Sequence, residues 1–443
     1  MAPRPTPRSR SALPRVGAAL CALGLPLTLG ACTPAPVDEA PAPAPAASGA
    51  EVTEAQADAL ASFSLRLFDA LEAESGPNAA EGRLASPLSV EYALAMTANG
   101  AEGQTRAQME ATLGMPVDQL NECLHAYAAT LQPDGGSEAQ EAEGADRAAA
   151  KETLRLANSL WIRDDLTVKE PFLQACGRWY DAKVIQAPFD ASTPSAANDW
   201  VSRYTDGMIE RIVDEADPLS VMLLVNAAAF EGTWLEPYEE GQVEADTFHS
   251  ASGTADEAQL MRSSEELYLE GPGCTGFLKP YDDGRFAFAA LLPEEGSTPE
   301  QLLASLDGPS LRALLKGASY DAVDAWLPKF ETSYGAQLRS VLGDLGMVDA
   351  FDPSTADFSG IGSGSLYVGD VAHKAFIRVD EQGTRAAAAT SVDIKLTSAL
   401  EPTEPKVVRL DRPFAYLIVD SQLNVPVFVG VMDGGPRAFS AAA

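Results

Sequence analysis

Histidine, cysteine and basic residues are all scarce in this chain of 443 residues. It contains three histidines, five cysteines and 31 Lys and Arg against 64 Asp and Glu, which gives a formal net charge of −33. A protein this acidic repels nucleic acid and other polyanions, so we expect no nucleic-acid partner. The only histidines are His125, His249 and His373, and no serine stands in a nucleophile elbow, so we do not expect an enzyme.

The cysteines form no pattern that indicates a cofactor or a metal. Cys21 and Cys32 lie near the N-terminus, and Cys123, Cys176 and Cys274 lie in the body of the chain. An odd count without paired spacing is neither a disulfide framework nor a metal site. We expect buried thiols and no metal or cofactor, although the sequence leaves open one bridge among the last three cysteines.

The N-terminus has a basic region but no apolar run long enough for a comfortable membrane span. Four arginines precede the apolar stretch 16–29, which ends in Leu29-Gly-Ala-Cys32. This ending resembles a bacterial lipoprotein processing box, which implies a signal peptide over 1–31 and a lipid on Cys32. The alternative is an ordinary secretory signal with a chance cysteine. Without residues 1–31 the chain has 27 basic and 64 acidic residues, a formal charge of −37.

A Pro/Ala-rich tether is expected to follow over residues 32–52. Thr33 stands where many inner-membrane lipoproteins of Gram-negative bacteria have an aspartate. We therefore expect an exported protein that is anchored by its lipid alone to the outer membrane or the cell surface.

The most informative stretch lies near the C-terminus, at Glu381–Leu400. Every second residue from Thr384 to Leu396 is small or apolar, and the residues between them are polar apart from Ala387 and Ala389. This two-residue period is typical of a strand with one buried face. The four alanines 386–389 also favour a helix end, and the Pro-containing 401–405 indicates an exposed loop. The stretch by itself leaves strand and helix open.

What precedes this stretch favours the strand. Residues 371–381 alternate as a strand that includes His373 and leads into Glu381-x-Gly383-Thr384 and the alanines. This sequence resembles the signature of the serpins, and the similarity extends from about residue 55 to residue 433. The resemblance implies an α+β fold with a large central, mostly antiparallel sheet, two further sheets, about eight or nine helices and an exposed reactive-centre loop.

The resemblance also implies roles for individual residues. The shutter, a polar network that holds the main sheet closed, is expected at Ser86, Ser89, Asn226 and His373. The breach, at the top of that sheet, is expected at Trp234, Lys329 and Glu381. The hinge of the loop is expected at Gly383, Thr384, Ala386, Ala387, Ala388 and Ala389. The segment Trp326–Phe330 is expected to be the family's sixth strand, and 221–234 the continuous third strand of the main sheet.

The implied activity is suicide inhibition of a serine or cysteine protease. The family's mechanism leaves a gap in the main sheet, and the loop, once cleaved, enters that gap as a new strand while an acyl bond still holds the protease. Counting seventeen residues from Glu381 places the reactive bond at Thr397–Ser398, with Leu396 as the neighbouring candidate. Such residues suit an elastase-like or subtilisin-like protease. A non-inhibitory serpin that acts as a binding or chaperone-like protein is the alternative, with Arg385 as the one feature in its favour.

The expected organisation is one serpin domain over 53–435, followed by a disordered tail at 436–443. Within the domain we expect an acidic mobile insertion at 133–152 and the reactive-centre loop at 382–405. The heparin-binding members of the family use basic helices. No such cluster occurs here, so we do not expect heparin binding. We expect a monomer whose partner is the target protease.

Overall fold

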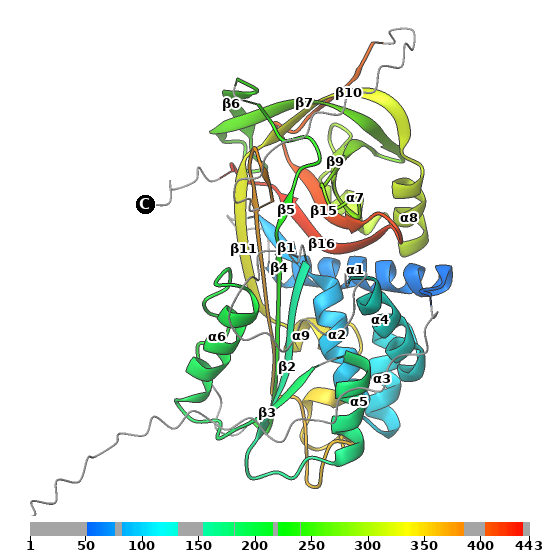
Figure 1. The fold of residues 1–443 in the computed structure, drawn as a ribbon, viewed down its shortest axis with the longest axis vertical. Helices are drawn as coiled ribbons and strands as arrows, with labels where there is room; N and C mark the ends of the chain where they lie inside the picture. The colour runs from blue at the N-terminus through cyan, green and yellow to red at the C-terminus, as the bar shows by residue number, and fades with distance from the viewer. Residues whose placement is uncertain are drawn as a thin grey trace, which may run out of the picture. The chain divides into compact units, whose positions relative to one another are not determined.

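The computed structural model describes residues 51–75, 82–131, 154–180, 182–215, 220–239, 241–384 and 404–436. These residues form α-helices, one 3-10 helix and two mixed β-sheets (Figure 1). The α-helices are α1 (Glu54–Ser75), α2 (Pro87–Ala98), α3 (Gly103–Leu113), α4 (Val117–Leu131), α5 (Glu170–Tyr180), α6 (Thr193–Tyr204), α7 (Pro299–Ala304), α8 (Gly308–Lys316) and α9 (Arg339–Asp344). The 3-10 helix η1 spans Asp349–Phe351.

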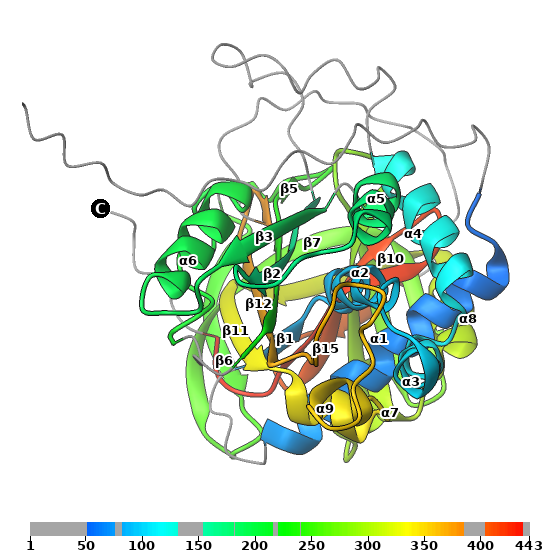
Figure 2. The ribbon, with the colours of Figure 1, turned by 90° about the horizontal axis from the view of Figure 1, so that it is seen from below.

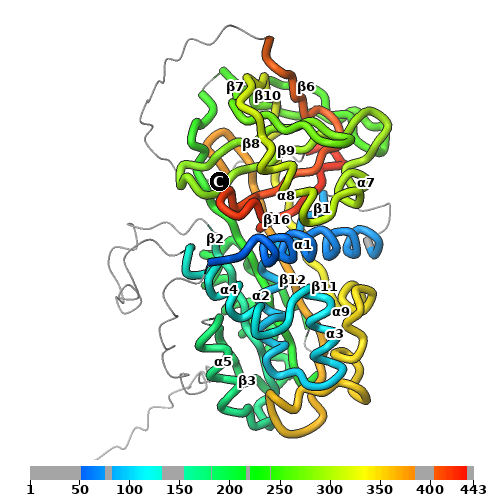
Figure 3. Tube along the Cα trace, turned by 90° about the vertical axis from the view of Figure 1, so that its right-hand side faces the viewer, coloured from blue at the N-terminus to red at the C-terminus, as the bar shows by residue number. Residues whose placement is uncertain are grey.

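The first sheet has nine strands. Its members are β1 (Arg83–Ala85), β6 (Val243–His249), β7 (Ala255–Gly271), β8 (Cys274–Pro280), β9 (Phe286–Pro293), β10 (Ser319–Pro328), β14 (Lys406–Arg409), β15 (Phe414–Asp420) and β16 (Val425–Met432). The two further sheets that we expected are joined into one, because β7 is a single strand of 17 residues that pairs with β6, β8 and β10. In Figure 3, α1 runs beside β16 of this sheet.

The second sheet has seven strands and is the main sheet of the expected fold. Its members are β2 (Leu154–Arg163), β3 (Lys183–Ala187), β4 (Met222–Phe230), β5 (Gly232–Thr233), β11 (Phe330–Gln337), β12 (Asp370–Val379) and β13 (Gly383–Thr384). The order is β3-β2-β4-β12-β13-β5. The remaining strand, β11, pairs with β12 as well.

Helices cover both faces of this sheet. Figures 1 and 2 show α2 on one face and α6 on the other. Every side chain of β4 is buried, as its unbroken apolar sequence predicts for a strand covered on both sides. Trp200 and Val201 of α6 belong to a small core with Val225 and Ala227 of β4, whereas the alternate residues of β4 face the large core. The middle of the sheet is therefore accessible from neither face.

Two strand predictions need correction. The expected sixth strand, Trp326–Phe330, is in fact the end of β10 and the start of β11, because the chain passes from one sheet to the other at Lys329. The expected continuous strand 221–234 is broken at Glu231 into β4 and β5. Pro328, which pairs with Leu260 of β7, is the last residue of β10 before this crossing.

Several predictions fall outside the described residues. They are the signal peptide, all but the last two residues of the tether with Cys32, the whole acidic insertion, the loop from Arg385 to Thr403, and all but the first residue of the tail. Within the described ranges, no helix is both long enough and apolar enough to cross a membrane.

Candidate functional site at the seam between β4 and β12

The seam is the line along which β4 and β12 pair in the middle of the seven-stranded sheet. The two strands are parallel, and residues 370–376 pair in order with residues 223–229. The expected gap is therefore not open in this state. Direct hydrogen bonding between β4 and β12 closes it, because two unpaired buried strand edges would be costly.

The four expected shutter residues meet on the α2 side of this seam. His373 Nδ1 lies 2.6 Å from Asn226 Oδ1, so the two side chains join the facing strands. Asn226 Nδ2 donates to Ser89 Oγ at 2.6 Å, and Ser86 N–H donates to His373 Nε2 at 3.2 Å. All four residues are buried. A bond between side chains across the seam adds to the ladder that must break if the sheet parts.

The hydrogen bonds define the state of the His373 ring. Because Ser86 N–H donates to Nε2, that nitrogen accepts, and Nδ1–H must donate to Asn226. Burial lowers the pKa of His373 to about 4. The imidazole is therefore neutral near neutral pH. Protonation would place an N–H at Nε2, which would then face the N–H of Ser86 with no acceptor between them.

The sequence analysis missed one member of this network, Asn158 in β2. Asn226 Nδ2 lies 2.5 Å from Asn158 Oδ1, and Ser89 Oγ lies 3.3 Å from the same oxygen. The network thus spans three adjacent strands, β2, β4 and β12. The available signal was an amide within the alternating residues 154–162, since a polar side chain that a sheet partly buries needs hydrogen-bond partners.

At the top of the seam, three consecutive carbonyls of the chain leaving β12 are bound by a segment after β5. Trp234 Nε1 donates to Asp380 O, Tyr238 N to Glu381 O, and Trp234 N to Gln382 O, each at 2.9 Å. Trp234 is buried and stacks on Tyr281 with 4.6 Å between ring centres. The root of the loop is therefore held by its backbone and not only by side chains.

The expected ion pair of the breach lies beside these carbonyls. Lys329 Nζ is 2.7 Å from Glu381 Oε1, and the two side chains are 15% and 31% exposed. Lys329 connects β10 to β11, so the pair ties that connection to the end of β12. Sequence analysis placed these two residues together, and the structure does so as well.

Gly383 and Thr384 form β13, which lies between β12 and β5. Thr384 pairs with Val379 on one side and with Gly232 on the other, and Gly383 pairs with Thr233. A Cβ on Gly383 would lie 2.0 Å from Gly232 O, so only glycine fits at this approach. The hydroxyls of Thr384 and Tyr281 are hydrogen bonded at 2.6 Å. The first two residues of the hinge therefore already occupy strand positions within the sheet.

The structure does not describe the remaining predicted site residues. Ala386 to Ala389, Leu396, Thr397 and Ser398 are outside the described residues, as is Cys32. Cys123, Cys176 and Cys274 are free and buried, and burial raises the pKa of the thiols of Cys123 and Cys274 to about 12 and about 11. Among the described residues, no group of three or more His, Cys, Asp or Glu side chains is placed to hold a metal ion.

Sequence comparison gives a family match over most of the chain. A family model described as Serpin (serine protease inhibitor) matches residues 58–433. An uncharacterized serpin-like protein of Thermococcus kodakarensis is 31% identical over 354 residues, which are 78% of this chain and 79% of that protein. Serpin-ZXA of Oryza sativa subsp. japonica is 32% identical over 387 residues, 83% of this chain and 94% of its own length.

Solved structures give the same result. The thermophilic serpin tengpin in its native state is 38% identical with a TM-score of 0.78, and the match covers 89% of this chain and 97% of tengpin. Tengpin in its latent state is 37% identical with a TM-score of 0.72, and the match covers 87% of this chain and 99% of tengpin. Thyroxine-binding globulin in complex with thyroxine shares the fold. It is 23% identical with a TM-score of 0.72, and the match covers 86% of this chain and 99% of the globulin.

Proposed function

The chain belongs to the serpin family, whose members are generally protease inhibitors and not enzymes, and we propose that it is an inhibitory serpin. In this proposal a serine protease, or a cysteine protease of similar specificity, cleaves the reactive-centre loop and is caught as an acyl-enzyme when the loop enters the seam. The observation that carries the proposal is β13, because its two residues already pair with both sides of the opening that insertion needs.

The pairing of β13 defines where each later residue would lie. Extending both antiparallel pairings by one residue at a time places residue 387 opposite Phe376 of β12 and Ala229 of β4. These two residues are paired with each other in the closed seam. The sheet can therefore admit the strand by lateral separation alone, without β4 sliding along β12.

The same register gives the length of the new strand. Residue 393 would lie opposite Asp370 and Leu223, the last pair of the present ladder. Insertion breaks one parallel ladder and forms two antiparallel ones over about ten residues. At roughly 1 kcal/mol net per hydrogen bond, the additional ladder supplies a driving force on the order of 10 kcal/mol, to which apolar burial adds.

The register also gives the facing of the side chains. Thr384 is buried and faces Tyr281, so Ala386, Ala388, Thr390 and Val392 would face the same core. Their small or apolar side chains suit that position. Arg385 would face the other way, so its charge would not enter the large core, and its presence is compatible with inhibition.

Thr390 would enter the shutter. The register places it opposite both His373 and Asn226, whose side chains are hydrogen bonded to each other in the closed seam. Insertion would separate these groups and bring a hydroxyl between them, which can both donate and accept. In this proposal the shutter of Ser86, Ser89, Asn226 and His373 keeps the seam closed before cleavage and receives a polar partner afterwards.

We place the reactive bond at Thr397–Ser398, with Leu396 as the neighbouring candidate. A Thr or Leu before the bond suits elastase-like and subtilisin-like proteases. The hinge of Gly383, Thr384 and Ala386 to Ala389 supplies the small residues that enter first, and the ion pair of Lys329 with Glu381 steadies the top of the sheet.

The test is to incubate residues 33–443 with pancreatic elastase and with subtilisin. We expect an adduct that survives denaturing electrophoresis and a released peptide that begins at Ser398 by mass spectrometry. Complete loop cleavage with fully active protease and no adduct for either enzyme would contradict inhibition of these two classes.

A thermal melt of the loop-cleaved chain distinguishes the remaining alternative. Insertion into the seam predicts a large rise in melting temperature after cleavage. An unchanged melting temperature would show that the loop does not insert, and would favour the non-inhibitory serpin that acts as a binding or chaperone-like protein.

We further propose that the protein is exported and anchored by a lipid on Cys32 at the outer membrane or the cell surface. The support is the Leu29-Gly-Ala-Cys32 sequence and the Pro/Ala-rich residues after it. In a Gram-negative host, the full chain should enter the detergent phase of a Triton X-114 partition and carry incorporated palmitate. The variant Cys32→Ser should do neither, and partition of the unchanged chain into the aqueous phase would exclude the anchor.

A further inference from the structure

Lys279, in β8, is an ammonium enclosed in the protein close to the root of the loop. Its Nζ donates to Glu265 Oε1 of β7 at 2.6 Å, and the two side chains are only 2% and 8% exposed. The same nitrogen lies 4.5 Å from the centre of the Tyr238 ring and 5.5 Å from that of Trp234. A desolvated cation attracts aromatic faces at these distances.

Both rings belong to the residues that bind the root of the loop. Trp234 binds the carbonyls of Asp380 and Gln382, and Tyr238 N–H binds that of Glu381. Ser263 Oγ lies 2.6 Å from Glu265 Oε1 and 3.4 Å from Tyr238 Oη, so it links the carboxylate to one of the rings. The ammonium therefore contacts the rings of two residues that together bind three consecutive carbonyls, one through the Trp234 ring and two through backbone N–H groups.

We propose that Lys279 is a positioning residue for loop insertion, because its ammonium fixes Trp234 and Tyr238 and through them the turn at 380–383. That turn joins β12 to β13, and in the proposed inserted state the same turn joins β12 to the full new strand. Holding it in place before cleavage provides the first ladder pairs, so insertion lengthens an existing strand and does not have to start one. This inference rests on the proposed function.

Stability alone does not account for a buried pair at this place. Taking two charges out of water is costly, and apolar residues of similar volume often give equal or greater stability. An apolar side chain at 279 would fill the space but would not attract the two ring faces. The contact of the ammonium with both rings is the property that only a cation supplies.

The experiment separates these two roles with a double variant. Lys279→Met alone leaves the Glu265 carboxylate buried and unpaired, so a loss of stability is expected for either role. Lys279→Met with Glu265→Gln removes both charges and keeps an acceptor for Ser263. We expect this double variant to regain most of its melting temperature.

Two readouts then test positioning in the double variant. The amides of Trp234 and Tyr238 should exchange with solvent about tenfold faster than in the unchanged chain, since a contact of this kind contributes roughly a factor of ten. The number of inhibitor molecules consumed per elastase or subtilisin molecule inactivated should rise severalfold, because slower insertion lets more acyl-enzyme hydrolyse. Unchanged exchange at both amides would overturn the inference.

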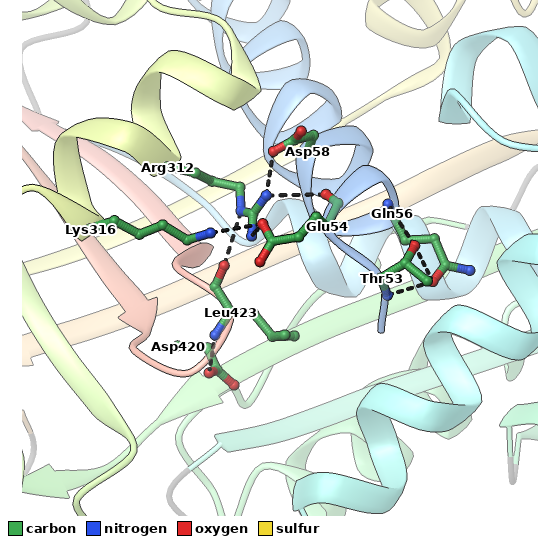
Figure 4. A network of polar contacts seen from close by, with 8 residues as sticks. All are labelled: Thr53, Glu54, Gln56, Asp58, Arg312, Lys316, Asp420 and Leu423. Carbon is green, nitrogen blue, oxygen red and sulfur yellow. Dashed lines mark hydrogen bonds and ion pairs between the residues drawn. The ribbon is translucent and has the colours of Figure 1, made fainter. Parts of the chain in front are cut away.

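Arg312→Met is the matched control. Arg312 of α8 is also buried, and it donates to Glu54 Oε2 at 2.8 Å and to the carbonyl of Leu423 at 3.0 Å, in a network at the start of α1 (Figure 4). This variant should lose stability without altering exchange at Trp234 and Tyr238 or the number of inhibitor molecules consumed. If the unchanged chain forms no adduct, the proposed function fails by its own test, and amide exchange still decides whether Lys279 positions the turn.

Discussion

At the scale of single residues, the hydrogen bonds of His373 depend on the protonation state of its ring. Its ring donates from Nδ1–H to Asn226 across the seam and accepts at Nε2 from Ser86 N–H, and the second of these bonds requires the neutral form. Burial lowers its pKa from 6.5 to about 4. The unfolded chain therefore binds a proton near pH 6.5 that the folded chain does not bind until about pH 4, so this contribution to stability is present above pH 6.5 and is lost as the pH falls toward 4.

The first prediction follows from the lowered pKa of His373. A pKa difference of one corresponds to about 1.4 kcal/mol, so His373 should account for about 2–3 kcal/mol of the stability lost between pH 7.5 and pH 4.5. His373→Gln should be less stable than the unchanged chain at pH 7.5 but lose that much less on acidification. Urea unfolding of both proteins at the two pH values measures the difference. Equal losses in the two proteins would rule out a titrating His373.

The second prediction concerns Gly383. In Gly383→Ala the new Cβ would lie 2.0 Å from Gly232 O and 2.8 Å from Thr233 Cα, so β13 must move away from β5. We expect a lower melting temperature and a several-fold larger fraction of loop cleavage without adduct. Gly343→Ala is the control, because its Cβ would meet no atom within 4 Å in α9 and should stabilise by about 0.5–1 kcal/mol. Equal behaviour of the two variants would contradict the role of the close approach.

At the scale of the element, the inserting strand can be tested at Thr390. While β4 and β12 are paired, no strand position exists for this residue between His373 and Asn226. Thr390→Val keeps the size and shape of the side chain but removes the hydroxyl, so the uncleaved chain should melt at the same temperature. After loop cleavage the variant should melt several degrees lower than the unchanged protein, because a buried polar group without a partner costs about 1–3 kcal/mol.

The matched control for this third prediction is Ser391→Ala, one residue further along. The register gives residue 391 the opposite facing, away from the shutter, so the cleaved form should keep its full rise in melting temperature. A loss in Ser391→Ala and none in Thr390→Val would show that the strand inserts one residue out of the derived register.

At the scale of the whole molecule, the large negative net charge should affect the stability of the folded chain. After removal of residues 1–31 the formal charge is −37, and self-repulsion of this size destabilises a compact state. The fourth prediction is that the melting temperature of residues 33–443 rises by a few degrees between 10 and 150 mM NaCl, over which the Debye length falls from about 30 to about 8 Å. Choline chloride at equal ionic strength should give the same rise. A rise with only one salt would indicate specific ion binding.

Features with a local sequence pattern could be predicted from the amino-acid sequence. The buried strand β4 and the alternation of β12 follow from the apolar run and the two-residue period of their own residues, and the motif from Glu381 to Thr384 identified the family. The resemblance also placed four shutter residues and the pair of Lys329 with Glu381, which the structure brings together from distant parts of the chain.

Features that depend on which strands lie side by side could not be predicted from local patterns and are seen only in the folded chain. The closed seam, the position of β13 between β12 and β5, and the hydrogen bonds of Asn158 with Asn226 and Ser89 all arise from pairing between segments far apart in sequence. The crossing at Lys329 and the cation at Lys279 have the same origin. Periodicity records which face of a strand is buried, but hydrogen-bond partners across a sheet and the neighbours of a buried charge depend on the packing of the whole chain.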